Sequence, residues 1–278
     1  MLLGFNGATT MKADLATDIA VAAEAGFAAL EIWAAKLDDY LADHSLAELR
    51  ALFERHGIRP ASINSIECIT FRDAAGREEG GARCRELCAI AQALGCEAIV
   101  VVPSPRPEGA TWEEVKAESV RVLRELAEIA APYGVELAFE FLGLADCSVN
   151  TLAGAWEIVK GVGRPNVGLV IDAFHFYVGG SKLSSIEQVD PAKLYIFHIS
   201  DAEDRPREEL TDAHRLLPGE GIIPLAEIVA RLMRIGFDGL CSVELFRPEY
   251  WELNPLELAR RAMATMTIIA DQGSASFG

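Results

Sequence analysis

The stretch Asn166-Val167-Gly168-Leu169-Val170-Ile171-Asp172 is an apolar run that ends on a carboxylate. Three other apolar runs end in the same way, on Glu140, His198 and Glu244. Carboxylates are rarely buried unless they are paired or bound to a metal, so a charged residue placed last in a buried strand is expected where the strand emerges from a sheet or barrel. Four such placements predict three carboxylates and one imidazole that converge on a divalent cation.

The hydrophobic period switches repeatedly along the chain, and short runs rich in Val, Ile and Phe alternate with longer segments of helical period. The short runs predict strands at 2–6, 29–33, 60–66, 98–102, 135–141, 167–172, 194–199 and 240–245. The longer segments predict helices at 12–25, 46–56, 78–94, 112–133, 152–162, weakly near 186, 224–235 and 255–270. Ser45, Thr111 and Thr151 mark helix starts. Eight strand–helix units in 278 residues match an α/β protein of the (β/α)8 (TIM) barrel type.

The chain is expected to form a single domain. A doubly wound sheet is the competing architecture, but the first predicted strand is followed by Asn6-Gly7-Ala8-Thr9-Thr10 and not by a G-x-G-x-x-G dinucleotide motif. No linker or low-complexity tract divides the chain. We expect one barrel over residues 1–272 and a loose C-terminal tail at 273–278.

Composition narrows the class of function. The hydrophobic fraction of 51% indicates a large core, and the net charge of −17 argues against nucleic acid or an anionic membrane surface as a partner. The N-terminus lacks the pattern of a signal peptide, and no apolar stretch approaches the roughly 20 residues that span a bilayer. Six cysteines without C-x-x-C pairing suit reduced thiols. We expect a cytoplasmic protein without disulfides.

Strand parity places the four candidate ligands on the inside of the barrel. If Glu140 points inward, Ala138 does too, while Leu137 and Phe139 face the helices. The same alternation puts Gly168 and Val170 beneath Asp172, Ile196 beneath His198 and Ser242 beneath Glu244. All four ligands then lie at the C-terminal ends of their strands, which is the face where barrel enzymes hold their active sites.

Three carboxylates and one imidazole form a hard, oxygen-rich ligand set. It suits one Mn²⁺, Co²⁺ or Mg²⁺ ion and can also hold Zn²⁺. A sugar carbonyl and its neighbouring hydroxyl could fill two further positions on such an ion, which would polarise the carbonyl and favour loss of the proton α to it. Glu140 and Glu244 are candidates for the groups that move this proton, because they come from different sides of the site.

Other polar residues are candidate substrate contacts. They are Asn6, Glu31 and Asn64 at strand ends, His175 three residues after Asp172, Arg205 and Asp212 in the loop after the seventh strand, and Arg247 after Glu244. Alternative roles remain open for them: His175 could orient a carboxylate or lie on the surface, and Arg247 could form a salt bridge at the rim. His214 could join Asp212 at the site, and Trp33 and Phe71 could be a cavity wall or core.

The chain resembles the xylose isomerase-like sugar phosphate isomerase/epimerase family over nearly its whole length. The resemblance runs from Phe5-Asn6-Gly7-Ala8-Thr9-Thr10 to Ser242-Val243-Glu244-Leu245-Phe246-Arg247-Pro248-Glu249-Tyr250. Within that family it is most similar to the inosose (2-keto-myo-inositol) isomerases of inositol catabolism. This closer likeness lies in Pro132-Tyr133-Gly134-Val135, in 166–172 with Phe174-His175-Phe176, and in Leu210-Thr211-Asp212.

The resemblance implies a function. It implies that Glu140, Asp172, His198 and Glu244 bind one divalent metal, that the two glutamates transfer the proton and that His175 contacts substrate. The implied activity is isomerisation of a small keto-sugar or keto-cyclitol through an enediolate. A homo-oligomer is compatible with it.

Other activities remain alternatives, because ketose 3-epimerases, hydroxypyruvate isomerases, inosose dehydratases and 3-dehydroshikimate dehydratases share the same site. Related endonucleases that cut abasic DNA use three zinc ions and histidines at the ends of strands two and three. Here Trp33 and Ser65-Ile66 occupy those ends, which disfavours a nuclease, although Asp212-Ala213-His214 is similar to the endonuclease pattern. A non-catalytic sugar-binding barrel also remains open.

Overall fold

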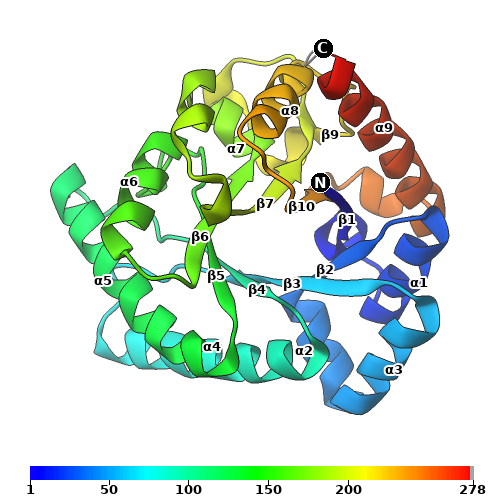
Figure 1. Cartoon of the computed structure of the whole chain (residues 1–278), viewed down its shortest axis with the longest axis horizontal. Helices are drawn as coiled ribbons and strands as arrows, with labels where there is room; N and C mark the ends of the chain where they lie inside the picture. Colours follow the sequence, from blue (N-terminus) through cyan, green and yellow to red (C-terminus); the bar gives the residue numbers. More distant parts are fainter. Residues whose placement is uncertain (276–278) are drawn as a thin grey trace.

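Eight parallel strands close into a barrel in the computed structural model, which describes residues 1–275. In order round the barrel they are β1 Leu2–Asn6, β2 Ala29–Trp33, β3 Arg59–Ile66, β4 Ala98–Val101, β5 Glu136–Glu140, β6 Val167–Asp172, β7 Leu194–Ile199 and β10 Leu240–Val243, and β10 pairs with β1. The strands surround the centre of the molecule and the helices form an outer ring (Figure 1). The predicted (β/α)8 barrel is confirmed.

The α-helices cover the outer face of the barrel. They are α1 Leu15–Ala25, α2 Ala34–Asp43, α3 Leu46–His56, α4 Ala74–Leu94, α5 Trp112–Ala130, α6 Leu152–Val162, α7 Ala173–Val178, α8 Leu225–Arg234 and α9 Pro255–Ala275. As predicted, Ser45, Thr111 and Thr151 are N-caps, and each side chain accepts a hydrogen bond from the backbone three residues on. Among residues 1–275, no helix is both long and apolar enough to cross a membrane.

Short elements lie mainly in the loops between strands and helices. The 3-10 helices are η1 Gly7–Thr10, η2 Ala131–Tyr133, η3 Leu183–Gln188, η4 Pro191–Lys193, η5 Arg207–Glu209, η6 Asp212–His214 and η7 Tyr250–Glu252. A small antiparallel hairpin pairs β8 Asp201–Ala202 with β9 Arg215–Leu216. This hairpin folds the loop after β7 back over the C-terminal end of the barrel.

Several boundaries differ from the sequence predictions. Helices α2 and α7 and the β8–β9 hairpin were not predicted, and the weak helix near 186 is the 3-10 helix η3. Helix α5 ends at Ala130 and continues as η2, because Pro132 has no N–H to donate within a helix. Helix α9 runs to Ala275, so 273–275 are helical where a loose tail was predicted. The rest of that predicted tail, 276–278, lies outside the described residues.

The core has two parts, and their membership confirms the predicted strand parity. A small cluster inside the barrel contains Ala138, Val170 and Ile196. A larger cluster between the barrel and the helices contains the intervening residues Leu137, Phe139, Leu169, Ile171, Cys241 and Val243. At the base of the barrel Gly168 has no room for a side chain, because a Cβ there would lie 2.5 Å from the ring of Tyr195. The inward columns beneath the four strand-end residues are therefore packed with small and medium side chains.

The burial of the cysteines makes a prediction about thiol reactivity. Cys68 is half-buried, whereas the other five cysteines are buried and all six are free. Burial raises the pKa of Cys96 and of Cys241 to about 12, and the thiolate is the reactive form. We expect Ellman's reagent at pH 8 to label one thiol per chain rapidly in the native protein, and Cys68→Ser to remove that phase. Rapid labelling of two or more thiols in the folded protein would contradict this burial pattern.

Candidate active site

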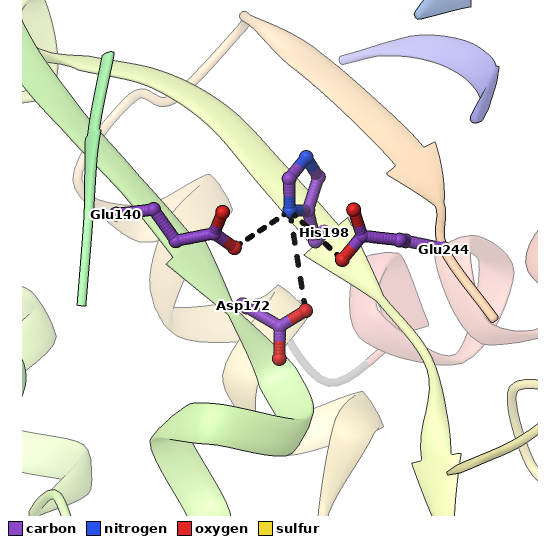
Figure 2. A group of neighbouring side chains, drawn as sticks. All are labelled: Glu140, Asp172, His198 and Glu244. Atoms are coloured by element: carbon purple, nitrogen blue, oxygen red, sulfur yellow. Dashed lines mark hydrogen bonds and ion pairs between the residues drawn. The ribbon is translucent and has the colours of Figure 1, made fainter. Parts of the chain in front are cut away.

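The four predicted metal ligands come together at the C-terminal mouth of the barrel. Glu140 and Asp172 are the last residues of β5 and β6, His198 is the second-last residue of β7, and Glu244 follows β10 directly. Figure 2 shows the three carboxylates pointing at one edge of the imidazole. His198 Nδ1 lies 2.9 Å from Glu140 Oε1, 3.4 Å from Glu244 Oε2 and 3.9 Å from Asp172 Oδ2. The donor atoms of the group lie within 4.8 Å of one another, so the group can hold one metal ion.

Glu140, Asp172, His198 and Glu244, called the cluster from here on, carry an excess of negative charge. Burial opposes charge on the imidazole, yet the carboxylates of Glu244, Glu31 and Glu140 raise the pKa of His198 well above its ordinary value. Burial, supported by the neighbouring carboxylates, also raises the pKa of Glu244 well above the ordinary range. Both shifts show that the cluster favours added positive charge. A divalent cation suits this buried oxygen-rich set in charge as well as in ligand chemistry.

Arg215, which the sequence analysis missed, supplies the one buried guanidinium beside the cluster among the described residues. It lies on β9, where Nη1 donates to Asp172 Oδ2 at 2.6 Å and Nε donates to Asp212 Oδ1 at 3.0 Å. Burial disfavours ionisation of Asp172, but Arg215, together with His175 and His198, outweighs it and lowers the pKa of Asp172 to about 2. The sequence pointed to Asp212-Ala213-His214, directly before Arg215, but nothing in the pattern marked Arg215 itself as buried.

His175 lies beside this ion pair, at the first turn of α7. Its backbone N–H donates to Asp172 Oδ1 at 2.7 Å, so Asp172 also caps the helix. Its Nε2 lies 3.1 Å from Arg215 Nη2 and 3.8 Å from Asp212 Oδ1. Its Nδ1 has no hydrogen-bond partner among the described residues. His175 is therefore buried within the site and not on the surface.

Glu31 differs from its predicted role as a substrate contact. It is fully buried in the middle of β2 and not at the strand end that was predicted. Its Oε1 lies 2.9 Å from His198 Nε2, although the N–H does not point straight at that oxygen. Ser62 Oγ donates to Glu31 Oε2 at 2.6 Å. Burial alone would raise the pKa of Glu31, but His198 and the hydrogen bonds from Ser62 and Asn6 lower it. A carboxylate on the far nitrogen of a metal-binding histidine orients the ring.

Asn6 and Asn64 also contact the cluster itself. Their amide groups donate to Glu244 Oε1 at 3.0 Å and 2.8 Å, and Asn6 in addition donates to Glu31. Oxygen Oε1 of Glu244 is thus held by two amides, while Oε2 faces His198. Both asparagines are buried, and Asn64 also lines the cavity above the cluster.

A cavity of about 500 Å³ opens over the cluster. Its lining includes Glu140, Glu244, Asn64, His175, Asp212, Met11, Trp33, Phe246, Leu142, Leu144, Cys68, Cys147, Glu67 and Asp146. Of the predicted substrate contacts, Asn64, His175 and Asp212 therefore lie at the cavity, and Trp33 forms part of its wall. An apolar cavity with a few convergent polar groups at this end of a (β/α)8 barrel is the usual setting of a barrel enzyme's active site.

Other predicted residues lie away from the cavity lining. Both arginines form ion pairs with the carboxylate of Glu203 at the rim: Arg205 Nε lies 2.6 Å from Oε2, and Arg247 Nη1 lies 2.7 Å from Oε1. Phe71 is half-buried and packs against the larger core cluster. The ring of His214 closes its own turn, where Nδ1 accepts from the backbone N–H of Thr211 at 3.0 Å. These side chains reinforce loops around the site.

Comparison with known proteins agrees with the fold and identifies the family. Residues 19–268 match the family model of the xylose isomerase-like TIM barrel. The chain is 41% identical to the inosose isomerase of Bacillus velezensis over 274 residues, which are 98% of each chain. It is 42% identical to the inosose isomerase of Bacillus subtilis over 267 residues, 95% of this chain and 96% of that one. A crystal structure of the IOLI protein with a bound zinc atom matches with a TM-score of 0.95 and 41% identity over 98% of this chain and 99% of that chain. The chain belongs to the xylose isomerase-like TIM barrel family.

The buried ion pair of Arg215 makes a prediction about stability. Replacing Arg215 with Met leaves Asp172 without its main cationic partner, so we expect the free energy of unfolding to fall by about 3–5 kcal/mol. Urea denaturation in the presence of EDTA measures this change. As a control, Arg205→Met removes an exposed pair with Glu203 and should change the free energy of unfolding by less than about 1 kcal/mol. Equal effects of the two substitutions would contradict the assigned difference in burial.

Proposed function

We propose that the chain is a divalent-metal-dependent isomerase of a keto-cyclitol, with inosose (2-keto-myo-inositol) as its substrate. The observation that carries the proposal is the group Glu140, Asp172, His198 and Glu244 beneath a substrate-sized cavity. The inosose isomerases that match almost the whole chain at about 41% identity support the substrate. The net charge of −17 disfavours binding of nucleic acid, which supports a small molecule as the partner. We infer that the enzyme is cytoplasmic. A homo-oligomer is compatible with this proposal.

The metal would be held by Glu140, Asp172, His198 and Glu244. The ligand set suits Zn²⁺, Mn²⁺, Co²⁺ or Mg²⁺, and zinc is the ion in the IOLI structure. When bound, such an ion supplies Lewis acidity that stabilises negative charge on a substrate oxygen. Around it, Glu31 would fix the ring of His198, and Arg215 would keep Asp172 ionised.

Glu140 and Glu244 would transfer the proton. One carboxylate removes the proton from the carbon next to the carbonyl, which leaves an enediolate, and a proton is returned to the former carbonyl carbon. The proton of the neighbouring hydroxyl passes to the former carbonyl oxygen. The carbonyl has then moved to the neighbouring ring carbon, and no atom is gained or lost. The two amides on Glu244 Oε1 would set the direction in which this carboxylate approaches the substrate. His175 and Asp212 lie where substrate hydroxyls could bind.

The proposed ligand set predicts the metal content of the protein. We expect isothermal titration of the metal-free protein with Zn²⁺ or Mn²⁺ to give about one ion per chain, and Glu140→Ala to weaken its binding by at least about tenfold. The control Glu203→Ala removes a carboxylate at the rim and should leave the titration unchanged. Three zinc ions per chain would instead support the nuclease alternative.

The reaction itself is tested by deuterium exchange. In D₂O and saturating metal, the protein should convert 2-keto-myo-inositol to an isomer that carries deuterium, observed by NMR. We expect Glu244→Gln to lower the rate of exchange by about 10²–10⁴-fold, because an amide cannot accept the proton. The exposed neighbour Glu249 provides the matched control, and Glu249→Gln should keep the wild-type rate.

The same NMR assay separates the alternative activities. D-fructose and D-tagatose report a 3-epimerase, and 3-dehydroshikimate or loss of water from inosose reports a dehydratase. Faster turnover of any of these than of inosose isomerisation would overturn the proposed substrate. Undiminished exchange in Glu244→Gln would overturn the role of Glu244.

A further inference from the structure

Glu244 stands one residue beyond the end of β10, where regular strand pairing has stopped. Its backbone N–H reaches Ile199 O of the neighbouring strand only at 3.4 Å, near the upper limit for a hydrogen bond. Glu140 and Asp172, in contrast, are the last residues inside their strands. The backbone of Glu244 therefore needs another support if its carboxylate is to keep a fixed position.

Thr9 provides this support from the turn that follows β1. Its buried hydroxyl donates to Val243 O at 3.0 Å and accepts from Leu245 N–H at 3.2 Å. These two peptide groups flank Glu244 on either side. A single hydroxyl thus replaces the strand pairing at Glu244, the one of the four predicted metal ligands that lies outside its strand.

The turn that carries Thr9 is itself held rigidly by a buried ion pair. Lys36 Nζ donates to Gly7 O and Thr10 O, each at 2.8 Å, and to Asp18 Oδ2 at 2.7 Å. Thr10 Oγ1 donates to the other oxygen of Asp18 at 2.6 Å. Both ends of η1 are therefore bound to one buried charge pair, and breaking such a pair is costly.

Two further contacts join the same turn to its surroundings. Trp251 Nε1, in the segment after Glu244, donates to Ala8 O at 3.1 Å. Asn6, directly before the turn, accepts from Ala8 N–H at 2.8 Å through Oδ1 and donates through Nδ2 to Glu244 Oε1 at 3.0 Å. The turn 7–10 with Asn6 consequently contacts Glu244 at both its backbone and its carboxylate.

We propose that Thr9 is a positioning residue for Glu244, and that the Lys36–Asp18 pair holds the turn that presents it. The inference rests on the proposed function only in that Glu244 binds the metal and moves the proton. Thr9 acts through the peptide groups of Val243 and Leu245 and has no direct contact with substrate in this role. Loss of its hydroxyl would let Glu244 shift, and small displacements of reacting groups lower the rate strongly.

The test uses three variants of the full chain. Thr9→Val keeps the shape and removes both hydrogen bonds, whereas Thr9→Ser keeps the hydroxyl. Thr265→Val is the matched control, because Thr265 on α9 also donates one hydrogen bond, to Ala262 O at 3.0 Å, far along the chain from the site. Zinc affinity is measured by titration of the metal-free proteins, kcat and KM are measured on inosose, and thermal unfolding shows that each variant is folded.

We expect Thr9→Val to weaken zinc binding about tenfold and to lower kcat about tenfold with little change in KM. Thr9→Ser should recover both values to within about twofold, and Thr265→Val should match the wild type. A purely structural role of Thr9 would lower the melting temperature without these changes. A folded Thr9→Val protein with wild-type zinc affinity and kcat would therefore overturn the proposal.

A milder variant covers the case in which Thr9→Val does not fold. Trp251→Phe keeps an aromatic ring but removes the hydrogen bond to Ala8 O, and it should weaken zinc binding and lower kcat, each by about two- to threefold. Wild-type values in Trp251→Phe would then overturn the positioning role of the turn. If the wild-type protein does not isomerise inosose, the proposed function fails, whereas the zinc titrations still decide the role of Thr9.

Discussion

Four carboxylates lie buried around one imidazole at the mouth of the barrel, and the surrounding structure depends on keeping them there. They are Glu31, Glu140, Asp172 and Glu244, and His198 lies between them. Buried carboxylates are unfavourable unless hydrogen bonds or opposite charges compensate them. Compensation comes from separate parts of the chain: a serine on β3, amides from β1 and β3, and a guanidinium on β9. Closure of the barrel brings these donors together, so the site and the fold support each other.

Much of the fold and of the ligand group could be predicted because both follow from short-range periodicity. A strand of alternating exposure places every second residue inside the barrel, and Ala138, Val170 and Ile196 lie there as that rule requires. A charged side chain at the last inward position of such a strand then lies at the C-terminal mouth of the barrel. The strand limits of β6 and β7 agree with the prediction at both ends, since apolar runs there are sharply bounded.

What could not be predicted depends on contacts between distant segments. Arg215 is on a strand of two residues, too short to give any periodic signal, and it reaches Asp172 only because the β8–β9 hairpin folds back over the barrel. Glu31 was predicted to lie at a strand end but is in the middle of β2, and its pairing with His198 depends on the distance across the barrel interior. Arg205 and Arg247 were predicted to contact substrate, but both pair with Glu203 and neither lines the cavity. The local sequence can therefore identify a charged residue, but its partner depends on the tertiary structure.

The lining of the cavity has a consequence for molecular recognition. Among the described residues that line it, Glu67, Asp146 and Asp212 add carboxylates to those of the cluster, and none is a lysine or arginine. A phosphate or carboxylate group on a ligand would meet like charges there without a guanidinium or ammonium to neutralise it. Hydroxyl groups, in contrast, can donate hydrogen bonds to each of these acids. The lining residues therefore offer hydrogen-bond acceptors to the hydroxyl groups of a polyol, and no lysine or arginine side chain to a phosphate or carboxylate group.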